Sequence, residues 1–393
     1  MKNPRVIVAA VGAIVLLGVG FLFVRSPKPA IEIKAEKITE FGFFPLVNTY
    51  TTSITVVVVL AIVAFLATRN LKLIPSGLQN MVEAVMEALY NLCVTTAGVK
   101  NGRRFFPFAA SLFVFIWIAN WMALLPYFNT IGSIEKVNAK EFHAISVVFT
   151  KSGPLGFIKP NQKALEFNAD EIDHACAGLS SAQHTSCIDG QRGLAIATRL
   201  DTKEHTNSVV SACTGSPGDT GYNECLVQAS STAISQLQDK GKELGILVPY
   251  FRSMNTDLNS PLSLAIMAMI FIEFWGITAL GVFKYLGKFF VNPLRNPIGT
   301  IVGLLEFFTE LARIISFTFR LFGNMLAGEI LLLVMTFLIP FVVALPFYAL
   351  ETFVGMIQAF VFFMLTVSFG ALAVASHDDH EEDAHRLEAS AHA

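Results

Sequence analysis

Charged and amide side chains recur at helical spacing inside one long apolar stretch of the chain. They are Glu306, Glu310, Arg313, Arg320 and Asn324, separated by 4, 3, 7 and 4 residues. That spacing puts them on one face of a helix. An arginine stays protonated at any accessible pH, and holding one near the centre of a bilayer costs about 3 kcal/mol or more. This face is therefore predicted to meet water or a protein partner.

A ladder of internal salt bridges is the plainer explanation for part of this face. Glu310 and Arg313 are three residues apart and can pair on the helix surface. Arg320 has no acidic residue within two turns on its N-terminal side, and Glu329 lies nine residues beyond it. Nine helical steps put Glu329 on the opposite face, about 13 Å further along the axis. Arg320 and Glu329 are thus expected to point in different directions.

A second set of polar residues is predicted to line an aqueous path from the outer side to mid-membrane. Glu351 and Gln358 are seven residues apart among Phe, Val, Met and Leu, so they share a helix face. Asp257 and Asn259 stand just ahead of another apolar segment. Together with Glu329 they form the predicted path, because ionisable groups inside a membrane usually mark ion pathways.

Composition identifies the kind of protein that positions these residues. The chain is 53% hydrophobic and 15% charged, with 35 Phe in 393 residues, which is typical of an all-α polytopic membrane protein and excludes an ordinary soluble enzyme. The net charge of −2 says little about partners.

Six apolar segments are long enough to cross a hydrocarbon core of about 30 Å. They lie at roughly 6–24, 50–67, 105–127, 261–283, 300–340 and 341–376. The fifth would span about 60 Å as one helix, twice that thickness, so it must tilt steeply or break. Pro340 and Pro346 offer a break before the last segment. Two long tilted helices in a hairpin are expected.

Short loops rich in Lys and Arg predict the orientation, since such loops face the cytoplasm. The relevant residues are Arg69, Lys72, Lys100, Arg103, Arg104, Lys284, Lys288 and Arg295. Counting crossings from there places the N-terminus inside, residues 128–254 outside and the tail after Ser376 inside. The first segment is interpreted as an uncleaved anchor rather than a cleaved signal, because no A-x-A-like site precedes Arg25.

Four of the five cysteines, Cys176, Cys187, Cys213 and Cys225, fall in the predicted outer insert, where disulfides persist. Two disulfides are expected, with three pairings open. A zinc site is the alternative because His174, His184 and His205 are nearby, but no CxxC pair is present. Within the insert, strands are predicted at 144–150 and 193–200 and a helix at about 222–244. The first helix after Pro75, from Leu78, is predicted to be amphipathic and to lie at the cytoplasmic surface.

Several motifs resemble subunit a of the F-type ATP synthase membrane sector. They are Arg320-Leu-Phe-Gly-Asn-Met-Leu-Ala-Gly-Glu329, the run from Glu351 through Gln358 to Phe362, Asn120-x-x-x-Leu-Leu-Pro126 and Asn255-x-Asp257-x-Asn259. The resemblance covers about 50–127 and 255–376. The first segment and the insert match nothing typical of that family.

The resemblance implies a proton-translocating stator that faces a ring of c subunits, each with a membrane carboxylate. Arg320 would face that rotor, favour the deprotonated carboxylate and separate two half-channels. The outer half-channel would use Glu329, Glu351 and Gln358, with Asn324, Asp257 and Asn259 nearby, and the inner one would follow Glu306. Arg313 and Glu310 are accessory candidates on that face.

Two departures from the family pattern stand out. Family members often carry a His at one of the positions held here by Glu329 and Glu351. Two carboxyl groups on one path repel, which would suit proton exchange. Arg313 stands where some relatives have Lys. Glu273, midway along the fourth segment, is a further accessory candidate that would contact a peripheral stalk or bond within the bundle.

These predictions together give the expected domain organisation of the chain. It comprises an anchor at 1–34, membrane helices at 35–127, an extracytoplasmic insert at 128–254, an ion-translocating core at 255–376 and an acidic, His-containing tail at 377–393. Expected partners are the c-ring, peripheral-stalk b subunits, the lipid bilayer of a bacterial cell membrane and an unidentified outer partner for the insert, but no nucleic acid. No cofactor or metal is expected, and the transported ion is H⁺ by default, Na⁺ being less favoured.

Two other classes of function were weighed. A membrane-embedded enzyme lacks support because no HExxH, GxSxG or CxxC motif occurs. A receptor with passive helices would not need Arg320, Glu329 and Glu351 inside its membrane segments. A metal-binding tail at 377–385 is the less favoured interpretation of that charged run.

Overall fold

The computed structural model describes ten stretches of the chain, and these fall into two compact units. The stretches are 37–41, 44–125, 128–139, 145–152, 157–166, 168–200, 212–239, 241–289, 297–338 and 344–375. One unit contains the described residues of 130–249 and 331–345, and the other contains those of 37–129, 250–330 and 346–375. The predicted anchor at 1–34 and tail at 377–393 lie outside the described residues.

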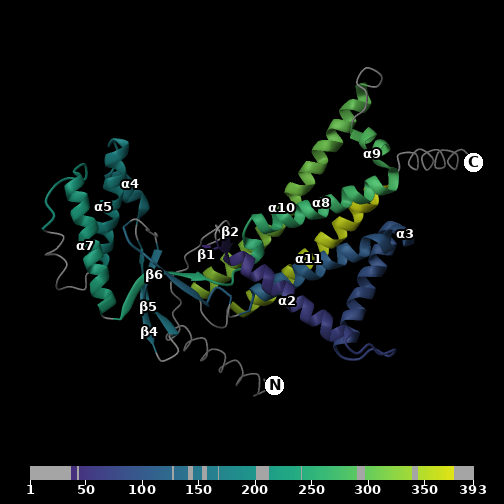
Figure 1. Ribbon diagram of the computed structural model, residues 1–393, viewed down its shortest axis with the longest axis horizontal. Coiled ribbons are helices and arrows are strands. Elements are labelled where there is room, and N and C mark those ends of the chain that lie inside the picture. The colour runs from purple at the N-terminus through teal and green to yellow at the C-terminus, as the bar shows by residue number, and fades with distance from the viewer. Residues whose placement is uncertain are drawn as a thin grey trace, which may run out of the picture. The chain divides into compact units, whose positions relative to one another are not determined.

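Five helices are long and apolar enough to cross a membrane. They are α2 (Asn48–Thr68), α3 (Leu78–Ala123), α8 (Asn259–Leu280), α10 (Pro297–Leu338) and α11 (Ala344–Val374) (Figure 1). They match the second to sixth apolar segments, so the prediction of a helical membrane protein is confirmed. The 42 residues of α10 span about 63 Å, and the predicted long helical pair is present as α10 and α11.

Two glycines make α3 turn back on itself. Gly98 has a φ of 75° and divides α3 into two arms, which meet at an angle in Figure 1. A left-handed φ suits glycine, which carries no Cβ. A Cβ at Gly102 would lie 2.7 Å from the carbonyl oxygen of Cys93, so the arms touch there through backbone. The first arm contains the helix predicted from Leu78, and its Cys93 is buried and free.

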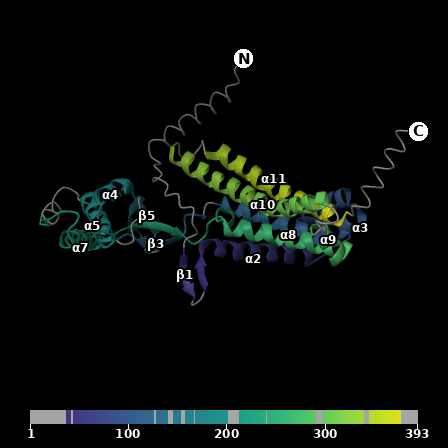
Figure 2. The same ribbon diagram turned by 90° about the horizontal axis from the view of Figure 1, so that it is seen from above.

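Stacked aromatic rings hold the membrane helices together. Phe105 of α3 stacks on Trp275 of α8 with ring centroids 4.2 Å apart. Phe317 of α10 meets Phe362 of α11 with centroids 4.8 Å apart. These residues belong to one buried apolar cluster drawn from α3, α8, α10 and α11, whose helices run together in Figure 2. Aromatic pairs contribute about 0.5–1.5 kcal/mol beyond their buried area.

Short elements complete this unit. A hairpin of β1 (Lys37–Phe41) and β2 (Phe44–Val47) precedes α2. A 3₁₀ turn, η1 (Met254–Thr256), leads into α8, and α9 (Val282–Phe289) follows it. The turn η1 is wholly buried, which brings its polar side chains inside the bundle.

The insert forms a mixed α and β unit. Its strands β3 (Gly132–Lys136), β4 (Ile145–Ser152), β5 (Phe157–Glu166) and β6 (Lys242–Pro249) form an antiparallel sheet in the order β3-β6-β4-β5. Its helices are α4 (Ala169–Ala175), α5 (Ser181–Leu200) and α7 (Thr220–Asp239). Val137, Ile196 and Leu244 form its core.

The predicted strand at 144–150 is confirmed over the described residues of β4, but the strand predicted at 193–200 is wrong. Residues 193–200 are the last two turns of α5. A short apolar run fits a buried helix as well as a strand, and here Gly193 lets α5 approach the backbone of Leu226 on α7. The helix predicted at 222–244 ends at Asp239, and Leu244 belongs to β6.

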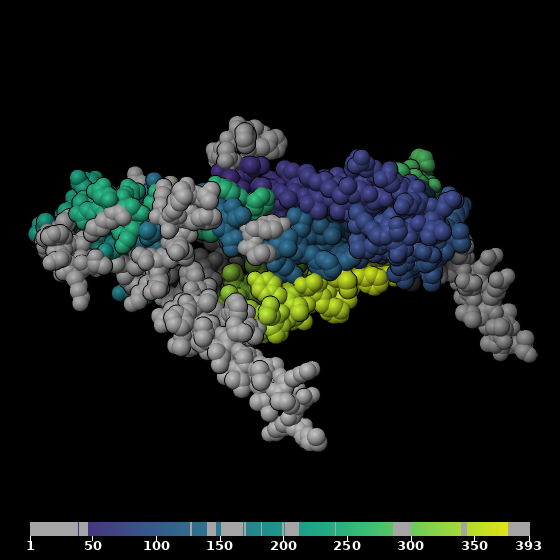
Figure 3. Space-filling view, turned by 90° about the horizontal axis from the view of Figure 1, so that it is seen from below, coloured from purple at the N-terminus to yellow at the C-terminus, as the bar shows by residue number. Residues whose placement is uncertain are grey.

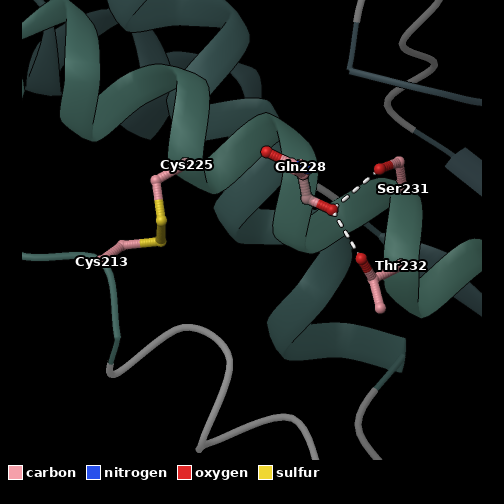
Figure 4. The surroundings of a disulfide bond; sticks show 5 residues. All are labelled: Cys213, Cys225, Gln228, Ser231 and Thr232. Atoms are coloured by element: carbon pink, nitrogen blue, oxygen red, sulfur yellow. Dashed lines mark hydrogen bonds between the residues drawn. A yellow bond between two sulfur atoms is a disulfide. The ribbon is translucent and has the colours of Figure 1, made fainter.

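Both expected disulfides form within the insert. Cys176 pairs with Cys187, joining the end of α4 to α5. Cys213 pairs with Cys225 and ties the preceding segment to α7 (Figure 4). Among the described residues no group of three or more His, Cys, Asp or Glu side chains is placed to hold a metal. His205, from the zinc alternative, lies outside them.

Replacing Cys213 and Cys225 together by serine is expected to lower the free energy of unfolding of the insert by about 3 kcal/mol, because the disulfide closes a loop in the unfolded chain. Protease digestion of the membrane-bound chain over a temperature series measures this change. Ser231→Ala is the control, since its hydroxyl bonds only the Gln228 carbonyl within α7 (Figure 4). Equal resistance of the double variant and the native chain would contradict the prediction.

Candidate functional site

The polar face predicted on the fifth segment lies on one unbroken helix. α10 runs through Glu306, Glu310, Arg313, Arg320 and Asn324 without interruption, so their helical spacing applies throughout. Glu310 and Arg313 form the i,i+3 ion pair that the sequence suggested. The Arg313 guanidinium also lies 4.3 Å above the ring of Phe369 on α11, an arrangement that stabilises a cation.

Arg320 differs from Arg313 because no carboxylate of the described residues pairs with it. Its Nη2 donates a long hydrogen bond of 3.4 Å to the hydroxyl of Ser316, one turn earlier. Its Nη1 is buried and has no hydrogen-bond partner, and no described carboxylate forms an ion pair with it. A buried charge without partners is costly. The guanidinium therefore retains the capacity to bind a group from outside this chain.

Asn324 links this face of α10 to α11. Its Nδ2 donates a hydrogen bond of 2.6 Å to Oε1 of Gln358. Asn324 stands one turn beyond Arg320, and Gln358 is 4% exposed. The Nε2 of Gln358 is buried and has no partner in the described part of the chain. The hydrogen bond between Asn324 and Gln358 thus places an N–H donor without a described partner, Nε2 of Gln358, close to the helix face that carries Arg320.

Glu351 lies against the backbone of α10. Its side chain is 7% exposed, and a Cβ at Gly328 would overlap its carboxyl group. Only glycine at position 328 leaves this room. Glu351, Gly355 and Gln358 are spaced by 4 and 3 residues, so they lie on one face of α11, and that face meets α10.

Asn120 fixes this face of α11 to α3. Its Nδ2 donates to the carbonyl oxygen of Gly355 at 3.0 Å, and its Oδ1 accepts from Nδ2 of Asn255 at 2.7 Å. The indole N–H of Trp121, the next residue of α3, donates to the carbonyl oxygen of Thr352 at 3.0 Å, and Thr352 lies about one turn before Gly355 on α11. α11 therefore runs alongside α3, as Figure 3 shows, and the η1 turn is bonded to both through Asn120.

Glu329 is paired with an arginine that the sequence analysis did not select. The Nε of Arg252 lies 3.7 Å from Oε1 of Glu329. The Nδ2 of Asn129 donates to the same oxygen at 2.9 Å. Arg252 is 6% exposed. The signal available in the sequence was a lone arginine after Tyr250 and Phe251, just before the Asn255 motif.

Asp257 and Asn259 are held at the start of α8. Asp257 Oδ1 accepts from the backbone N–H of Asn259 and Oδ2 accepts from the Thr49 hydroxyl, both at 3.4 Å. The side chain of Asn259 is exposed. Among the described residues no hydrogen bond or ion pair joins these two side chains to Glu329, Glu351 or Gln358. Their place on the predicted path stays a prediction.

Glu273 bonds within its own unit. It accepts a hydrogen bond of 2.6 Å from the hydroxyl of Tyr285 on α9. Burial raises the pKa of the Tyr285 hydroxyl above its ordinary value, and the hydrogen bond to Glu273 adds to that rise. This hydrogen bond supports the interpretation that Glu273 bonds within the helix bundle.

Glu306, the residue predicted for the inner half-channel, is half-buried on α10.

Polar and charged side chains follow one another along α10 and α11. Glu329 and the Glu351 carboxyl beside Gly328 stand at one end, and the Asn324–Gln358 pair leads toward Arg320. From Glu329 to Arg320 the rise along α10 is about 13 Å. Carboxyl groups gain and lose protons, whereas a guanidinium does not. The arrangement suits proton movement that ends at a fixed positive charge.

The sequence of this chain is similar to a known protein family and to proteins of known name. The family profile described as ATP synthase A chain matches residues 49–151 and 242–371. The protein named ATP synthase subunit a from Campylobacter curvus is 38% identical over 138 residues, covering 33% of this chain and 58% of that protein. Its namesake from Campylobacter concisus is 37% identical over 139 residues, covering 34% and 58%. The matched region thus spans little more than half the length of these relatives.

Two glycines of α10 provide a matched test of the close contact at Glu351. Gly328→Ala is expected to cost about 1–3 kcal/mol of unfolding free energy, because the new methyl group would overlap the Glu351 carboxyl group. Gly323→Ala is expected to be neutral or to stabilise by up to about 1 kcal/mol, because nothing lies within 4 Å of its Cβ position. Thermal unfolding of each variant in detergent measures the difference. Equal stabilities would contradict the contact.

Proposed function

Because this chain belongs to the ATP synthase A chain family, we propose that it is the ion-translocating stator subunit of an ATP synthase. In this proposal it provides two proton half-channels against a rotating ring of c subunits. The chain carries out no bond chemistry itself and serves the rotary complex as its ion path. The family match and five membrane-length helices support the proposal.

The proposed mechanism rests on one observation, which is that the Arg320 guanidinium has no carboxylate partner among the described residues. That guanidinium is partly buried. A carboxylate about 4 Å away on a passing ring would be attracted by about 4 kcal/mol at an effective dielectric constant of 20. That attraction favours the deprotonated carboxylate as it passes. Since arginine does not deprotonate, it also blocks direct proton leakage between the half-channels.

In the outer half-channel, protons would pass Glu329 and Glu351 before reaching the Asn324–Gln358 pair. The burial of Glu351 and Gln358 supports a polar route at this place, because buried polar groups inside an apolar bundle usually mark ion pathways. Asp257 and Asn259 would stand near the entrance. Each of these side chains would offer an oxygen atom that accepts a hydrogen bond from the proton's carrier within the membrane.

The inner half-channel would follow Glu306 and the Glu310–Arg313 pair toward the cytoplasmic loops. These three residues are half-buried on the same face of α10 as Arg320. Glu310 and Arg313 would keep part of this path polar, while Glu306 would meet the cytoplasmic water. Glu273 is an accessory candidate, with its Tyr285 bond as an alternative structural role.

The proposed partners are the c-ring, b subunits of a peripheral stalk and the lipids of a bacterial plasma membrane. Exposed apolar side chains on α10 support a partner surface or lipid contact there: Leu304, Leu305, Phe308, Leu311, Ile315 and Phe319. The insert would lie on the extracytoplasmic side, which suits its two disulfides. H⁺ is the proposed ion.

Arg320→Ala is expected to lower ATP-driven acidification of inverted membrane vesicles at least about a hundredfold, because the attraction that releases the ring proton is lost. The complex should assemble to the native level, which immunoblotting of the vesicles checks. Arg192→Ala in the insert is the control and should pump normally, since Arg192 pairs locally with Asp189. Pumping by the Arg320→Ala complex at the native rate would refute the mechanism.

The side of the insert is tested by thiol labelling. After reduction, a membrane-impermeant maleimide applied to intact cells should label Cys213 and Cys225, which are half-buried, because the proposed topology places them outside; Cys176 and Cys187 are fully buried and should react only once the insert unfolds. Cys93 is buried and should stay unlabelled in the same cells. Labelling of the insert that occurs only in inverted vesicles would reverse the topology.

A further inference from the structure

Tyr285 is a buried phenol that the proposed half-channels do not yet use. It belongs to α9, is 3% exposed, and donates a hydrogen bond of 2.6 Å to Oε2 of Glu273 on α8. Glu273 is half-buried and stands seven residues before the last residue of α8, about 10 Å from that helix end. An ionisable side chain at this depth in an apolar helix usually marks a functional site.

Two glycines bring the Tyr285 hydroxyl to Glu273. Gly281 has a φ of 83°, which suits a residue without a Cβ, and there the chain passes from α8 into α9 (Figure 2). The ring of Tyr285 rests on Gly276, where a Cβ would lie 2.5 Å from Cε2 of that ring. Glu273 and Gly276 are three residues apart and share a face of α8. Close packing on the backbone therefore fixes the hydrogen bond between Tyr285 and Glu273.

Two more carboxyl groups act on the same phenol from α10. Burial raises the pKa of the Tyr285 hydroxyl most, and its hydrogen bond to Glu273 raises it further. The negative charge of Glu273 and then those of Glu310 and Glu306 add to the rise in this pKa. Glu310 and Glu306 precede Arg320 by 10 and 14 residues on α10. Acidic groups of α8 and α10 thus act together on one phenol, on the inner side of Arg320.

Cations on the neighbouring elements have partners of their own. Arg313 pairs with Glu310, and Arg104 of α3 donates a hydrogen bond to the hydroxyl of Thr278. Among the described residues no cation forms an ion pair with Glu273. Its hydrogen-bond partner is a neutral phenol, and a carboxyl group bonded in this way can still gain and lose a proton.

A carboxyl group is more than the Tyr285 hydroxyl needs as an acceptor. An amide oxygen would accept the same hydrogen bond without placing an ionisable group inside an apolar helix. Like charges on α10 make a further carboxyl group at Glu273 electrostatically unfavourable. Both costs are explained if Glu273 takes up and releases protons.

We propose that Glu273 is a proton-carrying group of the inner half-channel and that Tyr285 is the residue that positions it. This inference rests on the proposed function above. A proton that leaves the ring near Arg320 would pass Glu273 on its way to the cytoplasmic water. It would bind Oε1 of Glu273, because Oε2 accepts the hydrogen bond from Tyr285. Tyr285 keeps its own proton and holds the carboxyl group in one orientation.

The first test measures ATP-driven acidification of inverted vesicles by the whole complex. Glu273→Gln keeps an oxygen that accepts the Tyr285 hydrogen bond but carries no proton, so pumping should fall about tenfold at native assembly. Glu273→Asp keeps a carboxyl group and should retain most of the native rate. Glu171→Gln, which changes an exposed carboxyl group in the insert, is the control and should pump normally. Native pumping by Glu273→Gln would overturn the proposal, and so would loss of the peripheral stalk from its vesicles.

Tyr285→Phe tests the positioning role. It keeps the ring against Gly276 and removes the hydroxyl, so pumping should fall about threefold at native assembly. The double variant with Glu273→Gln should pump like Glu273→Gln alone, because Tyr285 acts through Glu273. Additive losses in the double variant would overturn the positioning role. If Glu273→Gln does not assemble, Tyr285→Phe decides: lowered pumping supports the proposal and native pumping overturns it.

Thiol labelling tests whether water reaches Glu273 from the inner side. A small, charged, membrane-impermeant thiol reagent added to inverted vesicles should modify Glu273→Cys. It should not modify Phe274→Cys, since Phe274 is an exposed apolar side chain at the next position of α8. The native chain, with its buried Cys93, gives the background. Equal labelling of the two variants, no labelling of Glu273→Cys, or labelling only from outside intact cells would each overturn the proposal.

Arg320→Ala, measured beside these variants, keeps the two proposals apart. Native pumping by Glu273→Gln together with loss of pumping by Arg320→Ala would overturn the role of Glu273 and leave the ion path in place. Native pumping by Arg320→Ala would overturn the ion path itself, and with it the inference that rests upon it.

Discussion

A permanent positive charge in an apolar helix bundle, with no carboxylate of the described residues paired with it, is the constraint around which the membrane unit is arranged. Arg313 resolves the same problem internally through Glu310 and Phe369. Among the described residues, Arg320 has a single hydrogen-bond partner, the hydroxyl of Ser316 at 3.4 Å. An unpartnered guanidinium of this kind is costly to bury, so the structure around it makes sense when a second chain supplies the missing anion.

A close contact with the backbone at Gly328 and a hydrogen bond between two side-chain amides position the polar groups of α11 near the helix that carries Arg320. Gly328 makes room for the Glu351 carboxyl, and Asn324 binds Gln358 across the same pair of helices. Asn120 then locks α11 to α3 and to η1 by two side-chain hydrogen bonds. A polar network that is largely satisfied gives one defined arrangement, which a proton path needs. Stacked rings such as Phe105 on Trp275 supply the rigid apolar frame around it.

Local pattern predicted the helices and the stripe on α10 because both depend on residues close in sequence. The Glu310–Arg313 pair was predictable for the same reason. Arg252 was missed because its partner Glu329 is distant in sequence, and only the fold brings them together. The run at 193–200 was assigned to a strand because its helical partner, α7, is a tertiary feature. The disulfide pairing likewise depended on how α4, α5 and α7 are arranged.

The most direct measurement is the position of the Arg320 guanidinium in an experimental structure of the assembled membrane complex. The account predicts a carboxylate from a neighbouring chain within about 4–6 Å of Arg320, the range in which an opposite charge favours the ionised form, and no carboxylate of this chain at that distance. A guanidinium that faces lipid, or that pairs with Glu329 or Glu351 of its own chain, would contradict it.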